Sequence, residues 1–231
     1  MIAIIPARGG SKRVPNKNII SLHAEPLIHW TIKAAQDSNL FESICVSTDS
    51  NEIADIAIKS GAEVPFLRGK EDSDDITPVH IATINALIKF EFYLSKSFDV
   101  VVQLMPNCPL RSGADIINAY NHFCTNKSKF QISVFKFGWM NPWWALEIDK
   151  KTFKPSPIFN DTLKKRSQDL PDLYCPTGAV WIADAEALKK EKTFYGHNYS
   201  LFPMDWVNAI DIDDDDDLEM ARMLAEKYLS S

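Results

Sequence analysis

The stretch AIIPARGGSKRVPNKN, residues 3–18, decides the fold class and the kind of ligand to expect. A short apolar run, Ile2–Ile5, ends at Pro6 and leads into a loop that mixes cations with glycines and asparagines. Glycines let the backbone turn tightly and bring its N–H groups to a ligand, while lysine and arginine supply charge for a polyanion. The stretch therefore predicts a strand followed by a phosphate-binding loop. Its spacing matches neither GxxxxGK[ST] nor GxGxxG, and a solvated basic loop is the alternative.

Strand-like and helix-like segments alternate along the first part of the chain. Apolar runs such as Asp99–Leu104 are typical of buried parallel strands, and the segments between them carry apolar residues at helical spacing. The alternation predicts a doubly wound, mostly parallel α/β sheet whose ligands bind at the carboxyl ends of the strands. Strands are expected at residues 1–5, 43–48, 63–67 and 99–104, and helices at 27–39, 51–59, 79–94 and 113–123.

The pattern changes at about residue 130. Short strand-like runs at 131–137, 144–148 and 179–183 surround a polar, proline-rich stretch, residues 150–176, that is too long for an idle loop. We expect residues 130–176 to form an insertion that packs on a second subunit, with 1–129 and 177–231 as the main domain. The tryptophans of this region fit an aromatic interface, a substrate wall or core packing; they are Trp139, Trp143 and Trp144. A strand at 209–213 and a helix at 218–229 are expected to close the chain.

Composition limits the class of partner. The net charge of −6 disfavours a broad nucleic-acid surface, so any anion site has to be local. The sequence shows no long apolar run and no signal-peptide pattern, so we expect neither a membrane-spanning nor a secreted chain. Four cysteines without CxxC spacing read as reduced thiols in a cytoplasm.

Two carboxylates near the end of the chain are candidate metal ligands. Asp211 and Asp213 alternate with isoleucines in IDID, residues 210–213. On a strand, residues two apart project from one face, and carboxylate oxygens suit Mg²⁺. The alternative is that both belong to the acidic run 214–217, which the dipole of a following helix favours.

Three other polar residues are candidate ligand-binding residues only because of where they stand in the sequence. Arg166 could bind a carboxylate through its planar fork, although an arginine in a charged loop is usually surface decoration. Gln103 ends the apolar strand at 99–104 and can donate and accept hydrogen bonds at once. Arg68 with Asp75 and Thr77 forms another polar loop, whose plain interpretation is a turn and a helix cap.

Taken together, these segments resemble the acylneuraminate cytidylyltransferases (CMP-sialic acid synthetases). PARGGSKRVPNKN resembles their nucleotide-binding signature, PAR-x-x-S-K followed by a second Lys-Asn. Gln103–Pro106 with Pro109–Arg111 resembles their Q-P-T-S-P-L-R loop, with departures at Met105, Asn107 and Cys108. Further segments match in the same order: residues 46–49 the end of the second strand, 166–171 and 176–179 the sugar site, and 210–213 the metal motif.

The resemblance implies a three-layer fold of the nucleotide-diphospho-sugar transferase type, with 1–129 and 177–231 as nucleotidyltransferase core and 130–176 as dimerisation insertion of a homodimer. It implies Mg²⁺ and a reaction of CTP with a nonulosonic acid that gives a CMP-sugar and pyrophosphate. Arg8, Ser11, Lys12, Lys17 and Asn18 would hold the nucleotide, Asp211 and Asp213 the metal, and Arg68, Gln103, Arg166 and Gln168 would contact substrate.

Two alternatives remain at this point, a transferase for another acidic sugar such as 3-deoxy-octulosonate and a non-catalytic nucleotide-binding dimer. The sequence leaves open which nonulosonic acid is used: N-acetylneuraminate, legionaminate or pseudaminate. The tryptophan-rich run 139–144 favours an apolar, doubly N-acylated sugar.

Overall fold

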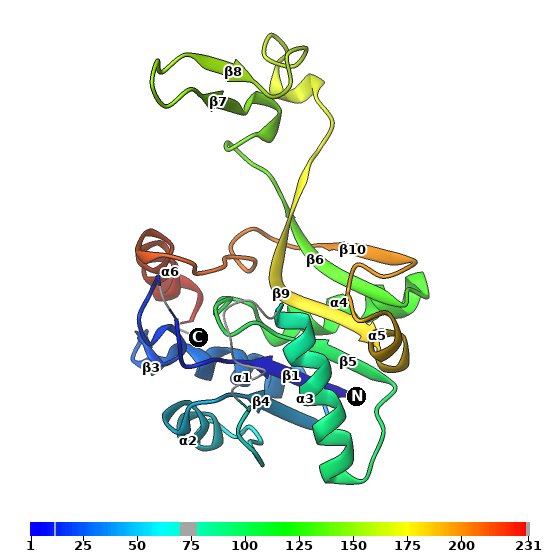
Figure 1. Ribbon diagram of the computed structural model, residues 1–231. Helices are drawn as coiled ribbons and strands as arrows, with labels where there is room; N and C mark the ends of the chain where they lie inside the picture. The colour runs from blue at the N-terminus through cyan, green and yellow to red at the C-terminus, as the bar shows by residue number, and fades with distance from the viewer. Residues whose placement is uncertain (12, 70–77, 230–231) are drawn as a thin grey trace.

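The protein consists of a body built around a central sheet and an arm that projects from it (Figure 1). The computed structural model describes residues 1–11, 13–69 and 78–229. Lys12, Asp75 and Thr77, named above, lie outside the described residues. None of the helices in the described ranges has the length and apolarity needed to cross a membrane.

The central sheet has six strands in the order β10-β6-β9-β5-β1-β4. β1 lies parallel to both β4 and β5, and β10 lies parallel to β6. β9 runs antiparallel to its two neighbours, β5 and β6. The predicted mostly parallel α/β sheet is thus confirmed. The strands are β1 Ile2–Pro6, β4 Ser43–Ser47, β5 Val100–Gln103, β6 Phe130–Lys136, β9 Tyr174–Asp184 and β10 Tyr199–Pro203.

Helices cover both faces of the sheet, which gives the fold three layers. Ile32 of α1, Ile53 of α2 and Ile116 of α4 share one buried cluster with the sheet. Leu87 of α3 and Leu188 of α5 belong to a second cluster with the other sheet residues. The helices are α1 Leu27–Asp37, α2 Asn51–Lys59, α3 Val79–Leu94, α4 Gly113–Asn126, α5 Ala185–Glu191 and α6 Asp215–Tyr228, and a small hairpin, β2 Ser21–Leu22 and β3 Glu25–Pro26, precedes α1.

The helix ends follow from local sequence. At the start of α4, Ser112 and Asp115 form a capping box, and Asp214 and Asp217 do the same for α6. The acidic run 214–217 is therefore explained by the helix start, where side-chain oxygens accept the free N–H groups.

Two expected strands differ in the structure. Residues 63–67 make only an isolated bridge, between Glu63 and Cys45. Residues 209–213, called here the acidic segment, were expected as a strand but are irregular. Their backbone is satisfied elsewhere, because Ile212 N–H donates to Asn107 O over 2.9 Å and Ala209 O accepts the Thr177 hydroxyl over 2.7 Å. The edge next to β6 is taken by β10, which the sequence analysis did not predict.

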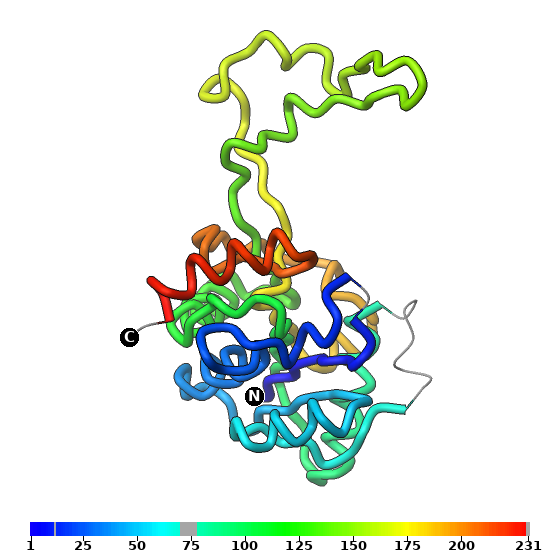
Figure 2. Tube along the Cα trace, turned by 90° about the vertical axis from the view of Figure 1, so that its left-hand side faces the viewer, coloured from blue at the N-terminus to red at the C-terminus, as the bar shows by residue number. Residues whose placement is uncertain are grey.

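The arm comprises residues 137–173, between β6 and β9, and both views show it standing away from the body (Figures 1 and 2). The antiparallel strands β7 Leu146–Ile148 and β8 Pro155–Pro157 form its hairpin, and the 3-10 turns η3 Pro142–Trp144 and η4 Ser167–Asp169 flank it. The segment expected as an insertion, 130–176, includes β6 and the first residues of β9, which pair within the central sheet.

Candidate active site

The phosphate loop, residues 7–16, follows β1 at the carboxyl edge of the sheet. Ala7 N–H donates to Ser47 O over 2.9 Å, and Gly9 N–H donates to Asp49 Oδ1 over 2.8 Å. The loop is thereby fixed to the end of β4. Asn16 closes it with a φ of 55°, a left-handed conformation that asparagine tolerates better than most residues.

Two residues of the short turn η1 (Lys17–Ile19) link the phosphate loop to its surroundings. Asn18 is buried, and its side-chain amide donates to Arg8 O over 2.8 Å. Asn18 therefore shapes the loop backbone. Lys17 points the other way, with Nζ donating to Ile212 O over 2.6 Å and lying 3.4 Å from Asp213 Oδ1. Lys17 thus joins the phosphate loop to the acidic segment.

The acidic segment is also tied to the loop that follows β5, residues 104–111, called here the β5 loop. Asn107 Nδ2 donates to Asp211 Oδ1, and to Ile212 O over 3.3 Å. Arg13 pairs with Asp213 over 3.0 Å from the phosphate-loop side. Asp211 and Asp213 therefore lie near Lys17 through contacts of an irregular segment, and not through the two-residue repeat of a strand that the sequence predicted.

An apolar cluster beneath these polar contacts packs the phosphate loop, the β5 loop and the acidic segment against one another. Burying an aliphatic side chain of this size stabilises a fold by about 1.5–3 kcal/mol. Because the buried side chains come from all three segments, each segment is anchored by its own residue. Among them are Val14 and Leu22 near the phosphate loop, Leu110 of the β5 loop, and Ile210 and Ile212 of the acidic segment.

The two carboxylates create an electrostatic cost that a cation would relieve. Burial, with the charge of Asp213 adding to it, raises the pKa of Asp211 to about 6, against the opposing effects of Lys17 and Asn107. Asp211 as a whole residue is exposed, so a ligand can reach its carboxylate although neighbouring atoms partly desolvate it. Carboxylate oxygens fit Mg²⁺. The described residues contain no cluster of three or more His, Cys, Asp or Glu suited to a metal, so water or phosphate oxygens would complete such a shell.

Gln103 ends β5 and Arg68 contacts the end of β4, and both side chains are engaged within the protein. Gln103 is fully buried, and its Oε1 accepts the Thr83 hydroxyl over 2.7 Å. Within the described part of the chain its Nε2 has no partner. Arg68 Nη2 donates to Ser47 O over 2.6 Å, which holds the end of β4. Aligned on Arg111, the seven-residue Q-P-T-S-P-L-R pattern begins at residue 105, so its glutamine position is a methionine here.

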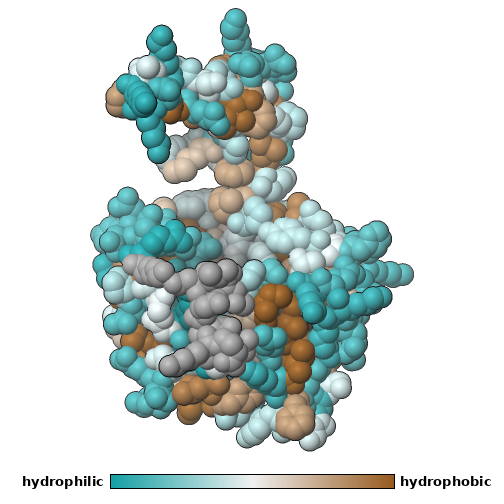
Figure 3. Space-filling model, viewed as in Figure 1, coloured by the Kyte–Doolittle hydropathy of each residue, from teal (hydrophilic) through white to brown (hydrophobic). Residues whose placement is uncertain are grey.

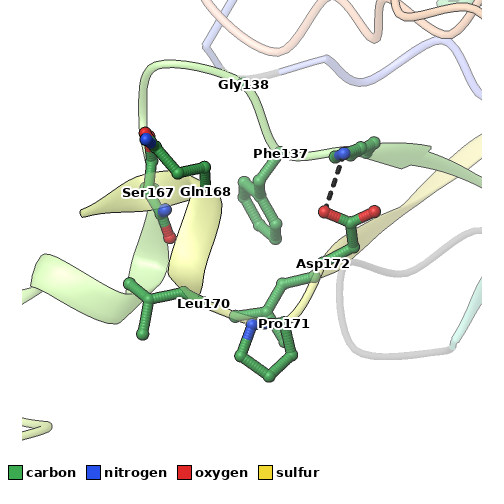
Figure 4. A pocket seen from close by; sticks show the side chains of 10 residues that line it. Phe137, Gly138, Ser167, Gln168, Leu170, Pro171 and Asp172 are labelled. Carbon is green, nitrogen blue, oxygen red and sulfur yellow. Dashed lines mark ion pairs between the residues drawn. The ribbon is translucent and has the colours of Figure 1, made fainter. Parts of the chain in front are cut away.

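Arg166 and Gln168 lie on the arm and are not brought to the phosphate loop of the same chain (Figure 1). Arg166 is exposed and pairs with Asp169, with Nε 2.8 Å from Oδ2. Gln168 lines a pocket of about 410 Å³ at the foot of the arm. Figure 4 shows Gln168 and Phe137 on its walls, with Asp172 paired to Lys136 over 2.7 Å.

Two contacting residues were missed as site candidates. Asn107 was noted only as a departure from a pattern, and Thr177, whose hydroxyl holds Ala209 O, was not singled out. The position of Asn107 in a loop directly after a central strand was the available signal. Thr177 carries no such signal, since its contact depends on how β9 meets the acidic segment.

Comparison with known proteins decides the family. A sequence profile of the cytidylyltransferase family matches residues 2–226. The chain belongs to this family. It is 35% identical over 227 residues to a pseudaminic acid cytidylyltransferase of Campylobacter jejuni, covering 96% of this chain and 95% of that one. It is also 35% identical over 228 residues to a CMP-N,N'-diacetyllegionaminic acid synthase of Legionella pneumophila, covering 98% and 96%. These relatives make this cytidylyltransferase a nucleotidyltransferase of the sialic and pseudaminic acid type.

A solved structure supports the same fold for this cytidylyltransferase. The CMP:2-keto-3-deoxy-manno-octonic acid synthetase complexed with CTP superposes with a TM-score of 0.71 and covers 98% of both chains. Its sequence identity is 15%, so the similarity shows the fold alone.

Proposed function

We propose that this cytidylyltransferase joins CTP to a nonulosonic acid, giving a CMP-sugar and pyrophosphate. The observation that carries the proposal is the convergence of Lys17, Asp211 and Asp213 beside a glycine-containing basic loop. The names of the relatives supply the substrate class. Because the reaction consumes CTP, we also propose the cytoplasm as its compartment.

The phosphate loop is the proposed triphosphate site. Its backbone N–H groups and the side chains of the loop and η1 would bind phosphate oxygens, as cations and glycine-rich turns do elsewhere. The anomeric hydroxyl of the sugar would form a new O–P bond at the α-phosphorus, while the bond from that phosphorus to the pyrophosphate breaks and the hydroxyl proton passes to water. The residues assigned to the nucleotide are Arg8, Ser11, Lys12, Lys17 and Asn18.

Asp211 and Asp213 would hold a Mg²⁺ ion. When bound, such an ion neutralises phosphate charge and acidifies a bound hydroxyl. The residues themselves do the positioning: Lys17 carries positive charge to the same segment, and Asn107 fixes the Asp211 carboxylate.

The arm is proposed to complete the sugar site of a partner subunit. Exposed apolar side chains lie on it among polar ones, seen in Figure 3 as brown residues among teal ones. Trp139 is 86% exposed and Phe153 79% exposed, which excludes core packing of these rings within one chain. Covering them in a homodimer would carry Arg166 and Gln168 to a second body, where Arg166 can pair with a sugar carboxylate. Gln103 and Arg68 remain proposed substrate ligands of the body.

Pyrophosphate release tests this function. The protein is incubated with CTP, Mg²⁺ and, separately, N-acetylneuraminate, legionaminate, pseudaminate and 3-deoxy-octulosonate. We expect release with at least one of the three nine-carbon acids and none without sugar. Release with 3-deoxy-octulosonate alone would select the alternative sugar class. Nucleotide binding without release in any mixture would indicate the non-catalytic dimer.

A further inference from the structure

Both carboxylate oxygens of Asp213 face cations from the phosphate loop and the turn that follows it. Arg13 Nη2 lies 3.0 Å from Oδ2, and Lys17 Nζ lies 3.4 Å from Oδ1. The backbone of Asp213 is fixed separately, because its N–H donates to Asp217 Oδ2 over 2.8 Å. A metal ion that binds this carboxylate therefore competes with at least one of the two side-chain cations, because like charges this close repel each other.

The two cations differ in how firmly they are held. The Lys17 side chain is 15% exposed, and its Nζ also donates to Ile212 O over 2.6 Å. The Arg13 side chain is 65% exposed. Its neighbour Val14 is buried in the apolar cluster, so the backbone is anchored here while the guanidinium moves on a long, flexible stem. Arg13 is therefore the cation that can leave Asp213.

The proposed reaction offers Arg13 a second partner, because Arg13 belongs to the loop that would bind the triphosphate. A guanidinium binds phosphate oxygens through charge-assisted, often bidentate hydrogen bonds, and a triphosphate carries more negative charge than one carboxylate. An exposed ion pair such as that of Arg13 with Asp213 adds little to stability. Breaking it in favour of the triphosphate therefore costs little.

We propose that Arg13 exchanges partners when substrate binds. Its guanidinium pairs with Asp213 in the protein without nucleotide, and it moves to the triphosphate of CTP when a metal ion binds Asp213. The inference rests on the proposed function, which assigns the metal ion to Asp211 and Asp213 and the triphosphate to the phosphate loop. The exchange makes each ligand favour the other, because the triphosphate withdraws the cation that repels the metal ion, and the metal ion releases Arg13 for the triphosphate.

Two binding measurements on the purified protein test the exchange without using activity. Mn²⁺ binding in the absence of nucleotide is followed by electron paramagnetic resonance, and CTP binding in EDTA is followed by isothermal titration calorimetry. Arg13→Ala should tighten Mn²⁺ binding about two- to fivefold, because an exposed ion pair no longer competes for Asp213. The same variant should weaken CTP binding about tenfold, the loss expected for charge-assisted hydrogen bonds to phosphate.

Three further variants complete the test. Arg222→Ala is the matched control, because it removes another exposed arginine, paired with Glu219 on α6 over 3.7 Å, and it should leave both affinities unchanged. Arg13→Lys keeps the charge and loses the planar fork, so both of its affinities should lie between those of the wild type and Arg13→Ala. Asp213→Ala should weaken Mn²⁺ binding. Far-UV circular dichroism checks folding, and Arg13→Lys decides if Arg13→Ala does not fold.

The opposite results separate this inference from the proposed function. Unchanged or weaker Mn²⁺ binding in Arg13→Ala, with weaker binding in Asp213→Ala, would show that Arg13 does not compete with the metal ion. Tighter Mn²⁺ binding with unchanged CTP binding in Arg13→Ala would show that Arg13 does not move to the triphosphate. Either result overturns the exchange and leaves the proposed function standing. Undiminished Mn²⁺ binding in Asp213→Ala would instead contradict the metal site of the proposed function.

Discussion

Lys17 Nζ lies 3.4 Å from Asp213 Oδ1, although 196 positions separate the two residues in the sequence. The same ammonium donates to Ile212 O over 2.6 Å. Through this contact, the end of the phosphate loop that follows β1 meets the acidic segment that precedes α6. The same cation would face the phosphate charge of CTP in the proposed reaction.

Lys17→Ala should lower kcat/KM for CTP about 10²–10³-fold, the usual cost of removing one charge-stabilising group. Lys33→Ala is a suitable control, because Lys33 pairs with Asp37 on the surface of α1 over 2.8 Å. Steady-state kinetics with CTP varied measure the effect. Equal CTP kinetics in the two variants would contradict the role of Lys17.

Asp211→Ala and Asp213→Ala should each lower kcat by about 10²–10³-fold or more, because each removes a proposed metal ligand. Mg²⁺ titration of the activity and circular dichroism of each variant separate loss of metal from loss of fold. Near-normal rates in both variants that EDTA still abolishes would place the metal elsewhere.

The stability of the metal-free protein should depend on the ionisation of Asp211. Burial and the Asp213 charge raise its pKa to about 6 from 3.8. Between these values the folded chain holds a proton that the unfolded chain has released, so this carboxyl lowers the free energy of unfolding as pH rises. Asp211→Asn removes the effect and keeps the acceptor for Asn107.

In EDTA, the Tm of Asp211→Asn should exceed that of the wild type by about 2 °C or more at neutral pH, with the gap closing near pH 4. Differential scanning calorimetry at several pH values measures it. A Tm difference that stays constant with pH would contradict the raised pKa.

The position of Arg166 on the arm predicts that active sites are shared between subunits. Arg166→Ala and Asp211→Ala should each be inactive alone. If each site takes Arg166 from the partner, equal mixing after subunit exchange should restore about a quarter of wild-type activity, because about half of the dimers carry one intact site. No recovery, with exchange shown by mass spectrometry of tagged chains, would place Arg166 in its own chain's site or outside any site.

Sequence periodicity predicted two helices with their bounds, one with a single apolar face and one that also exposes apolar side chains such as Phe92. Asn51–Lys59 and Val79–Leu94 are found with the predicted bounds. The prediction of a strand at 209–213 was wrong. The isoleucines that alternate with Asp there pack on α6 and the phosphate loop, and the segment pairs with no neighbouring strand. Alternation alone does not distinguish these cases.

The candidate site was predictable as a set of residues more than as a set of contacts. The basic loop and the carboxylates stand out by type and spacing, so Lys17 and Asp213 could be named. The contacts of Asn107 and Thr177 join segments more than 30 residues apart in the chain, about 104 and 32 positions. Such pairings arise from tertiary packing, which local sequence patterns do not encode.

Cytidylyl transfer at this site is tested most directly by ³¹P NMR of a mixture of the protein, CTP, Mg²⁺ and the nonulosonic acid that gives pyrophosphate. We expect the CTP signals to be replaced by those of a phosphodiester and of pyrophosphate in equal amounts, and the Asp211→Ala, Asp213→Ala double variant to leave CTP unchanged. Formation of other phosphorus products, or an unchanged rate in the double variant, would contradict cytidylyl transfer at this site.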